Sequence, residues 1–364
     1  MRKIMNNREL FNNIMHYRNF DRMPVLHWYQ WEETEERWHK EGLPAGIKKN
    51  EDIAKYLGAS EAYYPVGINL APYPAFEERV IEETPEYKIF LQEDGVIAKH
   101  SKGHSSIPHL IDYTLKGTEG EGWDEYKKRL QPDMGRFPAN FDEIIAKAKD
   151  ADSPVSVYVG SLIGWIRNWV GVENLAYISY DNRDLLKEMS DTITDLVLWN
   201  LDIILPKLKP DIVNGWEDIC CTSGPLISPA IFKEICVPNY ERIARKIHSY
   251  GIELYAVDCD GVIDSLLPLW LDAGVNVMFP CEIGTWKADP MAYRKKYGKK
   301  LRIYGGMNKG ELAKGRAAID AEIERKLPMM KEGGFVPLTD HYIPPDVSLD
   351  DYKYYLDKIR SIRI

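Results

Sequence analysis

The second half of the chain alternates short apolar segments with longer amphipathic ones, and this alternation limits the folds open to it. Strands are predicted at Pro154–Gly160 and Pro210–Trp216, and the second is followed by a helix around Pro229–Tyr250. Strands separated by helices of about 10–15 residues are typical of βαβ units, which form parallel sheets. Because the apolar runs are nearly continuous over several consecutive units, we predict an α/β TIM (β/α)8 barrel. The remaining strands expected in this half are Ile252–Val257, Val275–Phe279, Leu301–Tyr304 and Gly334–Pro337.

The first third of the chain is less regular, and we interpret it as an N-terminal extension, a first barrel strand and an insertion. Met23–Trp31 is the expected first strand. Tyr87–Lys102 is typical of a hairpin, because Asp94-Gly95 supplies the positive φ angles of a tight turn. We expect this hairpin to be inserted near the barrel mouth, and Ser106–Pro138 to form loop and helix over one rim. No linker interrupts the chain, so residues 1–364 are predicted to form one domain.

Composition excludes several classes of function. The 364 residues carry a formal net charge of −9, without the clustered Lys and Arg of a nucleic-acid-binding surface. No window approaches about 20 consecutive apolar residues, so no membrane span is expected. The N-terminal segment lacks the apolar core of a signal peptide, and the five cysteines include no Cys-x-x-Cys pair. We therefore expect a cytoplasmic protein with free thiols.

Polar side chains follow most of the predicted strands, and the active site of a TIM barrel is built from the C-terminal strand ends. Carboxylates with one imidazole suit a metal ion, and a catalytic zinc site typically keeps one coordination position open. Alternative structural roles stay open for some of these residues: Asp218 and Asp260 could cap helices, Glu217 could pair with an arginine, and His341 could donate to a backbone carbonyl. His100 and His104 are expected at the surface. The expected metal ligands are Glu217, Asp258, Asp260, Glu282 and His341.

Aromatic residues are also frequent near the expected mouth, where they could hold a planar substrate ring or simply pack the rim. Glu217, Asp258 and His341 are the expected catalytic residues. The expected substrate contacts are His27, Trp28, Tyr29, Trp216 and Asn308.

Two segments of the chain resemble the uroporphyrinogen decarboxylase superfamily. Leu226–Phe232, with the sequence LISPAIF, matches the Leu-x-Ser-Pro-x-x-Phe helix start of that family. His341–Ser348 is similar to its late His/Cys-x-x-Pro-Pro segment, and Asp258-Cys259-Asp260-Gly261 falls where relatives carry a short polar motif. The resemblance covers most of the chain from about Pro154 onward. It implies a TIM barrel that is frequently homodimeric in relatives.

Two branches of this superfamily differ in their sequence motifs. The decarboxylases carry an Arg-Gln-Ala-Gly-Arg stretch after the first strand, which binds substrate carboxylates. Here the corresponding segment, His27–Glu33, has no arginine, although His341 matches a late histidine of the decarboxylases. The corrinoid-linked methyltransferases that act on coenzyme M hold zinc through His-x-Cys and a late Cys. Asp258-Cys259-Asp260 and His341 replace these ligands, so an oxygen-rich site with a different substrate is expected.

The resemblance and the residues together lead to a prediction of function. We expect a zinc-dependent methyltransferase that moves a methyl group from a small aromatic methoxylated substrate to a corrinoid carried by a separate protein. In this hypothesis zinc polarises the ether oxygen of the substrate. A cofactor-free decarboxylase acting on a smaller acid, with Asp258 or His341 as proton donor, is one alternative. A non-catalytic binding barrel is the other.

Overall fold

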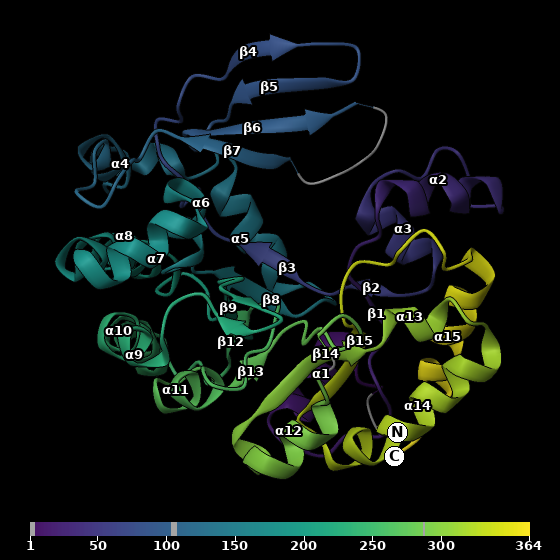
Figure 1. The fold of residues 1–364 in the computed structure, drawn as a ribbon. Helices are drawn as coiled ribbons and strands as arrows, with labels where there is room; N and C mark the ends of the chain where they lie inside the picture. The colour runs from purple at the N-terminus through teal and green to yellow at the C-terminus, as the bar shows by residue number, and fades with distance from the viewer. Residues whose placement is uncertain (1–3, 103–107, 287) are drawn as a thin grey trace.

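The computed structural model describes residues 4–102, 108–286 and 288–364. Its centre is a parallel sheet in which seven strands follow the order β15-β14-β13-β12-β9-β8-β3 (Figure 1). The chain order of the last five strands is also their spatial order, as expected for successive βαβ units. Their bounds are β3 (Tyr64–Val66), β8 (Val155–Tyr158), β9 (Ile212–Trp216), β12 (Tyr255–Asp258), β13 (Val277–Met278), β14 (Arg302–Met307) and β15 (Phe335–Thr339).

The sheet curls into a TIM barrel through the N-terminal strand. β1 (Leu26–His27) pairs in parallel with β2 (Ser60–Glu61), which is separated from β3 only by two residues. A parallel bridge between Gln30 and Ile343 joins the end of β1 to the segment after β15. The predicted fold class is therefore confirmed, and the predicted strand Met23–Trp31 is confirmed with a shorter regular core.

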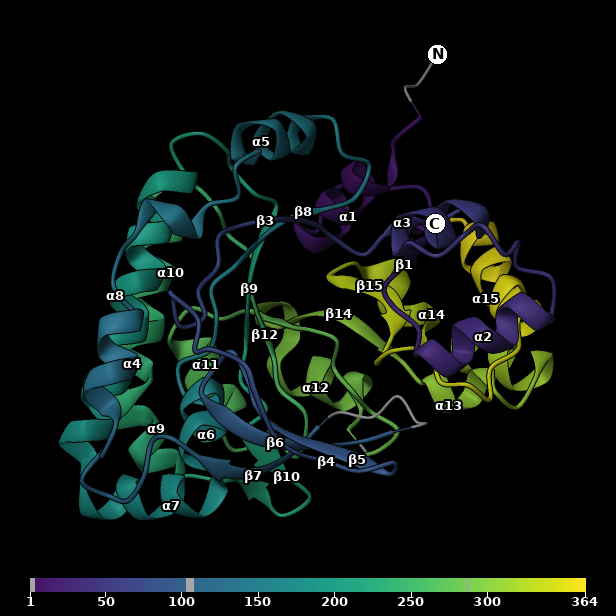
Figure 2. The same ribbon diagram turned by 90° about the horizontal axis from the view of Figure 1, so that it is seen from above.

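Helices cover the outside of the barrel, and Figure 2 shows the turned view, with α8 and α10 side by side on the left. Within the described part of the chain, the helices before β8 are α1 (Asn7–Met15), α2 (Glu32–Lys40), α3 (Asn50–Tyr56), α4 (Trp123–Arg129), η1 (Met134–Arg136) and α5 (Phe141–Lys149). Those that follow β8 and β9 are α6 (Gly164–Val170), α7 (Val172–Asp181), α8 (Arg183–Ile204), α9 (Pro229–Ile235) and α10 (Val237–Ser249). The remaining helices are α11 (Leu267–Asp272), α12 (Pro290–Tyr297), η2 (Gly298–Lys300), α13 (Lys309–Leu312), α14 (Arg316–Glu332) and α15 (Leu349–Ser361).

Two motifs noted in the sequence start helices in the structure. The Ser228 side chain accepts a hydrogen bond from the backbone N–H of Ile231, and Pro229 occupies the first helical position of α9. Ser348, at the end of the Pro-Pro segment, accepts in the same way from Asp351 at the start of α15. Each motif therefore fixes where a helix begins behind a barrel strand.

The predicted hairpin is confirmed, but it is the centre of a larger sheet. β5 (Tyr87–Leu91) and β6 (Val96–Ser101) pair with β4 (Arg79–Glu83) and β7 (His109–Tyr113) in a four-stranded antiparallel sheet at the top of Figure 1. The expectation of loop and helix over Ser106–Pro138 is therefore wrong where β7 lies. His104 lies outside the described residues, and His100 is half-buried in β6.

Large aromatic rings fill the barrel interior. Tyr304 on β14 contacts Tyr63 and Phe279, with ring centroids 5.4 and 5.1 Å away. Its hydroxyl donates to the carbonyl of Ala62 across the barrel, at 2.6 Å. All five cysteines are free thiols, as predicted. Among the described residues, no helix is both long and apolar enough to cross a membrane.

Candidate metal centre at the barrel mouth

Three aspartates meet where β9 and β12 end. Asp258 is the last residue of β12, Asp260 follows two residues later, and Asp218 lies in the loop after β9. One carboxylate oxygen of each lies within 4.8 Å of the others. The backbone N–H of Asp260 donates to the Asp218 carboxylate at 2.9 Å. Asp218 has a positive φ of 46°, a conformation that L residues rarely adopt and that is common at functional sites.

The electrostatics of this group favour a bound cation. Burial, together with the negative charges of Asp218, Asp260 and Glu282, raises the pKa of Asp258 well above its usual value. Burial and the charges of Asp218 and Glu282 raise the pKa of Asp260 to about 8. The pKa of Asp218 is also raised by burial, although the Asp260 N–H and the Arg167 charge oppose this. Asp260 Oδ1 is buried without a hydrogen-bond partner among the described residues.

Glu282 and His341 lie beside the three aspartates and have other partners. Glu282 forms an ion pair with Lys309 at 2.5 Å and accepts from the Trp286 indole N–H at 2.5 Å. Burial alone would raise the pKa of Glu282, but the Lys309 contact outweighs it and lowers the pKa. Burial, helped by the Lys309 charge, lowers the pKa of His341. The His341 ring stacks on Trp31, with centroids 6.4 Å apart and planes 17° apart.

Glu217 is separated from this group by its hydrogen bonds. One carboxylate oxygen accepts from Ser161 Oγ and from the backbone N–H groups of Ile163 and Gly164, each at 2.9 Å. The other accepts from the Leu162 N–H at 2.9 Å and from the Tyr240 hydroxyl. These five donors occupy both oxygens at the start of α6, so the structure does not bring Glu217 into the group of acids that the sequence analysis expects at the metal. The residue that joins the group instead is Asp218.

Two of the expected substrate contacts are structural. His27 is fully buried, with Nδ1 bonded to the Tyr352 hydroxyl and Nε2 to Gln30, both at 2.9 Å. Burial lowers its pKa to about 4. Asn308 caps α13, since its side-chain oxygen accepts from the N–H of Gly310 at 2.9 Å. Both ring nitrogens of His27 are therefore engaged by other side chains, and in Asn308 the cap engages the side-chain oxygen.

Comparison with known proteins gives the family. A family model described as uroporphyrinogen decarboxylase matches residues 120–362, which is more than half of the chain. The chain belongs to the uroporphyrinogen decarboxylase family. One similar solved structure is a methyltransferase from Methanosarcina mazei, with a TM-score of 0.63 and 15% identity. The alignment covers 98% of this chain and 100% of the methyltransferase. Among curated proteins, none matches the chain significantly.

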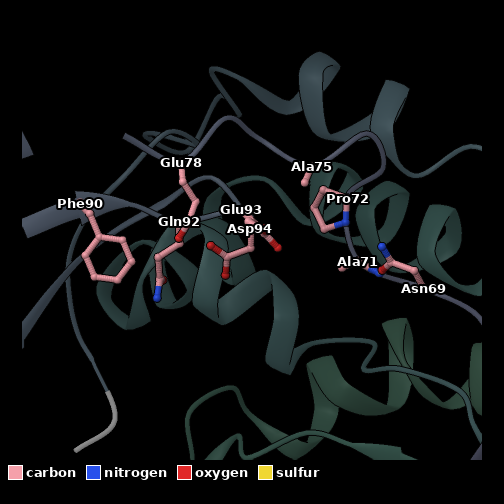
Figure 3. A pocket seen from close by; sticks show the side chains of 9 residues that line it. All are labelled: Asn69, Ala71, Pro72, Ala75, Glu78, Phe90, Gln92, Glu93 and Asp94. Carbon is pink, nitrogen blue, oxygen red and sulfur yellow. The ribbon is translucent and has the colours of Figure 1, made fainter. Parts of the chain in front are cut away.

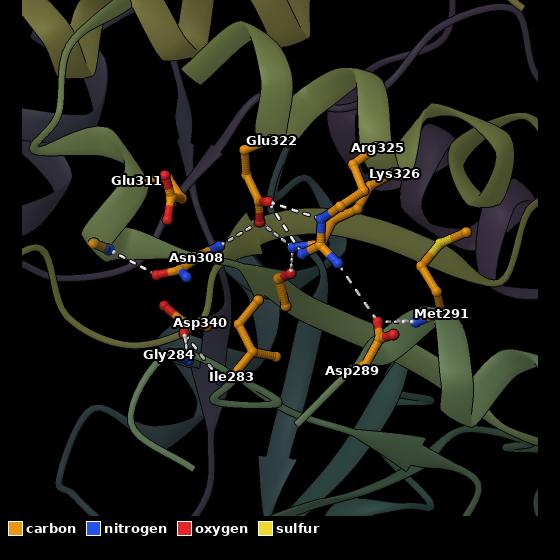
Figure 4. A network of polar contacts seen from close by, with 12 residues as sticks. Ile283, Gly284, Asp289, Met291, Asn308, Glu311, Glu322, Arg325, Lys326 and Asp340 are labelled. Atoms are coloured by element: carbon orange, nitrogen blue, oxygen red, sulfur yellow. Dashed lines mark hydrogen bonds and ion pairs between the residues drawn. The ribbon is translucent and has the colours of Figure 1, made fainter. Parts of the chain in front are cut away.

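A buried polar network supports the opposite side of the mouth in this member of the uroporphyrinogen decarboxylase family (Figure 4). Asp340, completely buried, accepts from the backbone N–H groups of Ile283 and Gly284 through one oxygen, and from that of Lys309 through the other. Asp340 therefore ties together the loops after β13, β14 and β15. Because Lys309 is held by its own backbone, its ammonium group is positioned beside Glu282.

A groove extends from Asp218 toward α6 and the insertion sheet. It has a volume of about 800 Å³ and extends from β7 past α6 to Asp218 and Cys221. Trp216 borders this region through the Arg167 guanidinium, which lies 5.2 Å from the indole centroid. Trp28 and Tyr29 instead line a separate cavity of about 70 Å³, which is too small for an aromatic substrate. The expected aromatic contacts are therefore split between two places.

Another hollow, of about 380 Å³, lies between the Asn69–Ala75 loop and the turn between β5 and β6 (Figure 3). Its lining includes Glu78, Glu93 and Asp94 but none of the residues that gather at the barrel mouth. The groove that ends at Asp218 is therefore the better candidate for the substrate of this uroporphyrinogen decarboxylase family member.

Proposed function

We infer that the protein is a metal-dependent methyltransferase that transfers a methyl group from a small methoxylated substrate to a corrinoid carried by a partner protein. The observation that carries this proposal is the close group of Asp218, Asp258 and Asp260, with a buried and unpartnered oxygen on Asp260. The likeness to the Methanosarcina mazei methyltransferase concerns the fold. The acid-rich mouth, and the absence of arginine from His27–Glu33, where the decarboxylases carry theirs, support the choice of branch.

The donor set fits a divalent cation. Three carboxylates within 4.8 Å of one another repel when ionised, and a dication between them removes that repulsion. Three protein oxygens leave coordination positions open, as a catalytic zinc site requires. When bound there, zinc would act as a Lewis acid toward the ether oxygen of a methoxy group. His341 lies near enough to Asp218 for its charge to act on that carboxylate.

The residues of the chain have distinct tasks in this proposal. Asp218, Asp258 and Asp260 hold the cation, and the Asp260 N–H keeps the Asp218 carboxylate in place. Lys309 forms an ion pair with Glu282 and so neutralises a fourth negative charge at the mouth. The groove beside Asp218 admits the substrate, and the methyl acceptor approaches from the open mouth.

Metal content separates this proposal from the alternatives. Elemental mass spectrometry should find about one zinc per chain in the purified protein, and loss of zinc in Asp218→Asn and Asp258→Asn. Asp142→Asn is a matched control, because Asp142 is exposed and pairs with Lys207 at the surface. Incubation of methoxyarenes with the protein and cob(I)alamin should give methyl-cobalt absorbance. A folded protein that neither contains nor binds zinc would sink the proposal.

A decarboxylase is the second candidate, and one observation favours it. Without a cation, Asp260 retains its proton up to a pH of about 8, so a neutral carboxyl group at the mouth could donate a proton to the carbon that loses carbon dioxide. Release of carbon dioxide from a small carboxylic acid by the metal-free protein would support this function. The methyl-transfer assay would then give no signal.

A further inference from the structure

Arg167 on α6 lies in the groove beside the three aspartates. Its Nε and Nη2 donate to the side-chain oxygen of Asn168 at 3.2 and 2.9 Å, and Nη1 donates to the backbone carbonyl of Asp218. The guanidinium carbon lies 5.2 Å from the ring centroid of Trp216. The side chain is therefore held in place from three sides, by an amide, a carbonyl and an indole.

None of these acceptors is a carboxylate. Among the residues that the structure describes, Arg167 makes no ion pair, whereas Arg183 in the neighbouring α8 pairs with Glu234 at 3.2 Å. A guanidinium has five N–H donors, so contacts to Asn168 and Asp218 leave donors over on the two Nη atoms. The carboxylate of Asp218 lies near enough to feel the Arg167 charge, but it belongs to the proposed cation site. When the cation neutralises Asp218, Arg167 is left without an ion pair to any carboxylate of the described residues, although Glu173 lines the same groove.

The groove around Arg167 has the size and lining of a small-molecule site. Its volume of about 800 Å³ lies within the range of about 300–1,000 Å³ usual for such sites. Leu110, Val170 and Leu226 supply apolar walls. The Tyr113 ring of β7 closes one side and packs on Gly171, where an added Cβ would lie 2.6 Å from the ring. The insertion sheet therefore helps to form the groove.

We propose that Arg167 binds a planar anionic group of the substrate, such as a carboxylate, and so orients the substrate's other end toward the aspartates. A planar guanidinium with spare donors on both Nη atoms matches two oxygens of a carboxylate, and its fixed position lowers the entropy lost on binding. A partly buried arginine without a counter-ion also gains most from an anionic ligand. This inference rests on the proposed function for the identity of the reacting end, but the anion site can be tested without any reaction.

The test compares benzoate with benzamide, which has nearly the same shape and no charge. Isothermal titration of the zinc-loaded protein should show benzoate binding at least about tenfold tighter than benzamide, since bonds between charged groups are the stronger ones. Arg167→Gln should abolish this preference, Arg167→Lys should retain part of it, and Arg183→Gln should leave it unchanged. Equal binding of the two probes, binding of neither, or a preference that survives Arg167→Gln would overturn the proposal.

Two controls keep this result separate from the fate of the proposed function. The zinc content and circular dichroism of each variant show whether loss of the Asp218 contact has damaged the cation site or the fold; if Arg167→Gln is damaged, Arg167→Lys alone is compared with the unmodified protein. Benzoate preference without methyl transfer would sink the proposed reaction and leave the anion site standing. Methyl transfer that is equally efficient from methoxybenzene and methoxybenzoate would overturn the anion site alone.

Discussion

The carboxylates of Glu217 and Asp218 are adjacent in the chain but belong to different structures. Glu217 accepts five hydrogen bonds at the start of α6, whereas Asp218 lies within 4.8 Å of carboxylate oxygens of Asp258 and Asp260. The positive φ of Asp218 turns the chain between the two environments. The hydrogen bonds of Glu217 therefore fix the loop that positions Asp218.

This relationship predicts opposite effects of two neighbouring substitutions. Glu217→Gln places an amide N–H against existing donors, so we expect the free energy of unfolding to fall by about 3 kcal/mol while the folded fraction still binds zinc. Asp218→Asn should instead remove zinc with a small effect on the stability of the metal-free protein, because it relieves repulsion among the acids. Urea unfolding and elemental analysis of both variants check this. Loss of zinc from folded Glu217→Gln at normal stability would contradict it.

Zinc binding should release protons. Because Asp260 has a pKa of about 8 in the metal-free protein, the cation must displace its proton at neutral pH. The zinc affinity is expected to fall as the pH is lowered below about 8. Titration calorimetry at pH 7 in buffers of different ionisation enthalpy measures the released protons. In Asp260→Asn, fewer protons should be released; equal release in both proteins would rule out Asp260 as their source.

His27 should make stability depend on pH in the acid range. Its pKa is about 4 in the folded protein and near 6.5 when unfolded, so between these values only the unfolded chain binds the proton. The contribution of neutral His27 to the free energy of unfolding should therefore be fully present above pH 6.5. The free energy of unfolding should decrease by about 3 kcal/mol as the pH falls to 4. Urea unfolding of His27→Gln across this range should show a shallower slope. The matched variant His248→Gln, at an exposed position, should keep the original slope.

Gly305 on β14 should tolerate no side chain. An added Cβ would lie 1.8 Å from the carbonyl oxygen of Pro280, and φ is +125°. We expect Gly305→Ala to lower the free energy of unfolding by more than about 3 kcal/mol, or to prevent folding. Gly298→Ala is the control, because Gly298 also has a positive φ but has nothing within 4 Å of the added atom. Its cost should be only about 1–2 kcal/mol, which thermal unfolding can compare.

The sequence predicts the barrel well because strand and helix periodicities are local properties. It also places Asp258 and Asp260 correctly at a strand end, where side chains from different strands converge. The choice between Glu217 and Asp218 was not accessible from periodicity, because it depends on the N–H groups of α6 and on a positive φ. A Gly at the start of α6 is the available signal: an added Cβ at Gly164 would lie 2.1 Å from the Glu217 carbonyl oxygen.

The same limit applies to His27 and Arg167. His27 lies at the end of a strand, where catalytic residues of a barrel are found. Its Nδ1, however, forms a hydrogen bond with the hydroxyl of Tyr352 in the last helix, more than 300 positions away. The sequence gives no signal for Arg167, because its proposed role depends on the lack of an ion pair with a described carboxylate, which is a property of the folded chain. Long-range partners, present or missing, decide these roles, and residue type alone does not reveal them.

The stacking of His341 on Trp31 gives the mouth a built-in optical reporter. Trp28 also meets the imidazole edge-on, with centroids 5.8 Å apart, so two indoles border one titratable ring. The emission of an indole responds to charge and polarity within a few ångströms. Protonation of His341, entry of a cation or arrival of a ligand should each change the fluorescence of this pair. The difference between the unmodified protein and Trp31→Phe would isolate that signal, allowing events at the mouth to be timed in a stopped-flow instrument without any label.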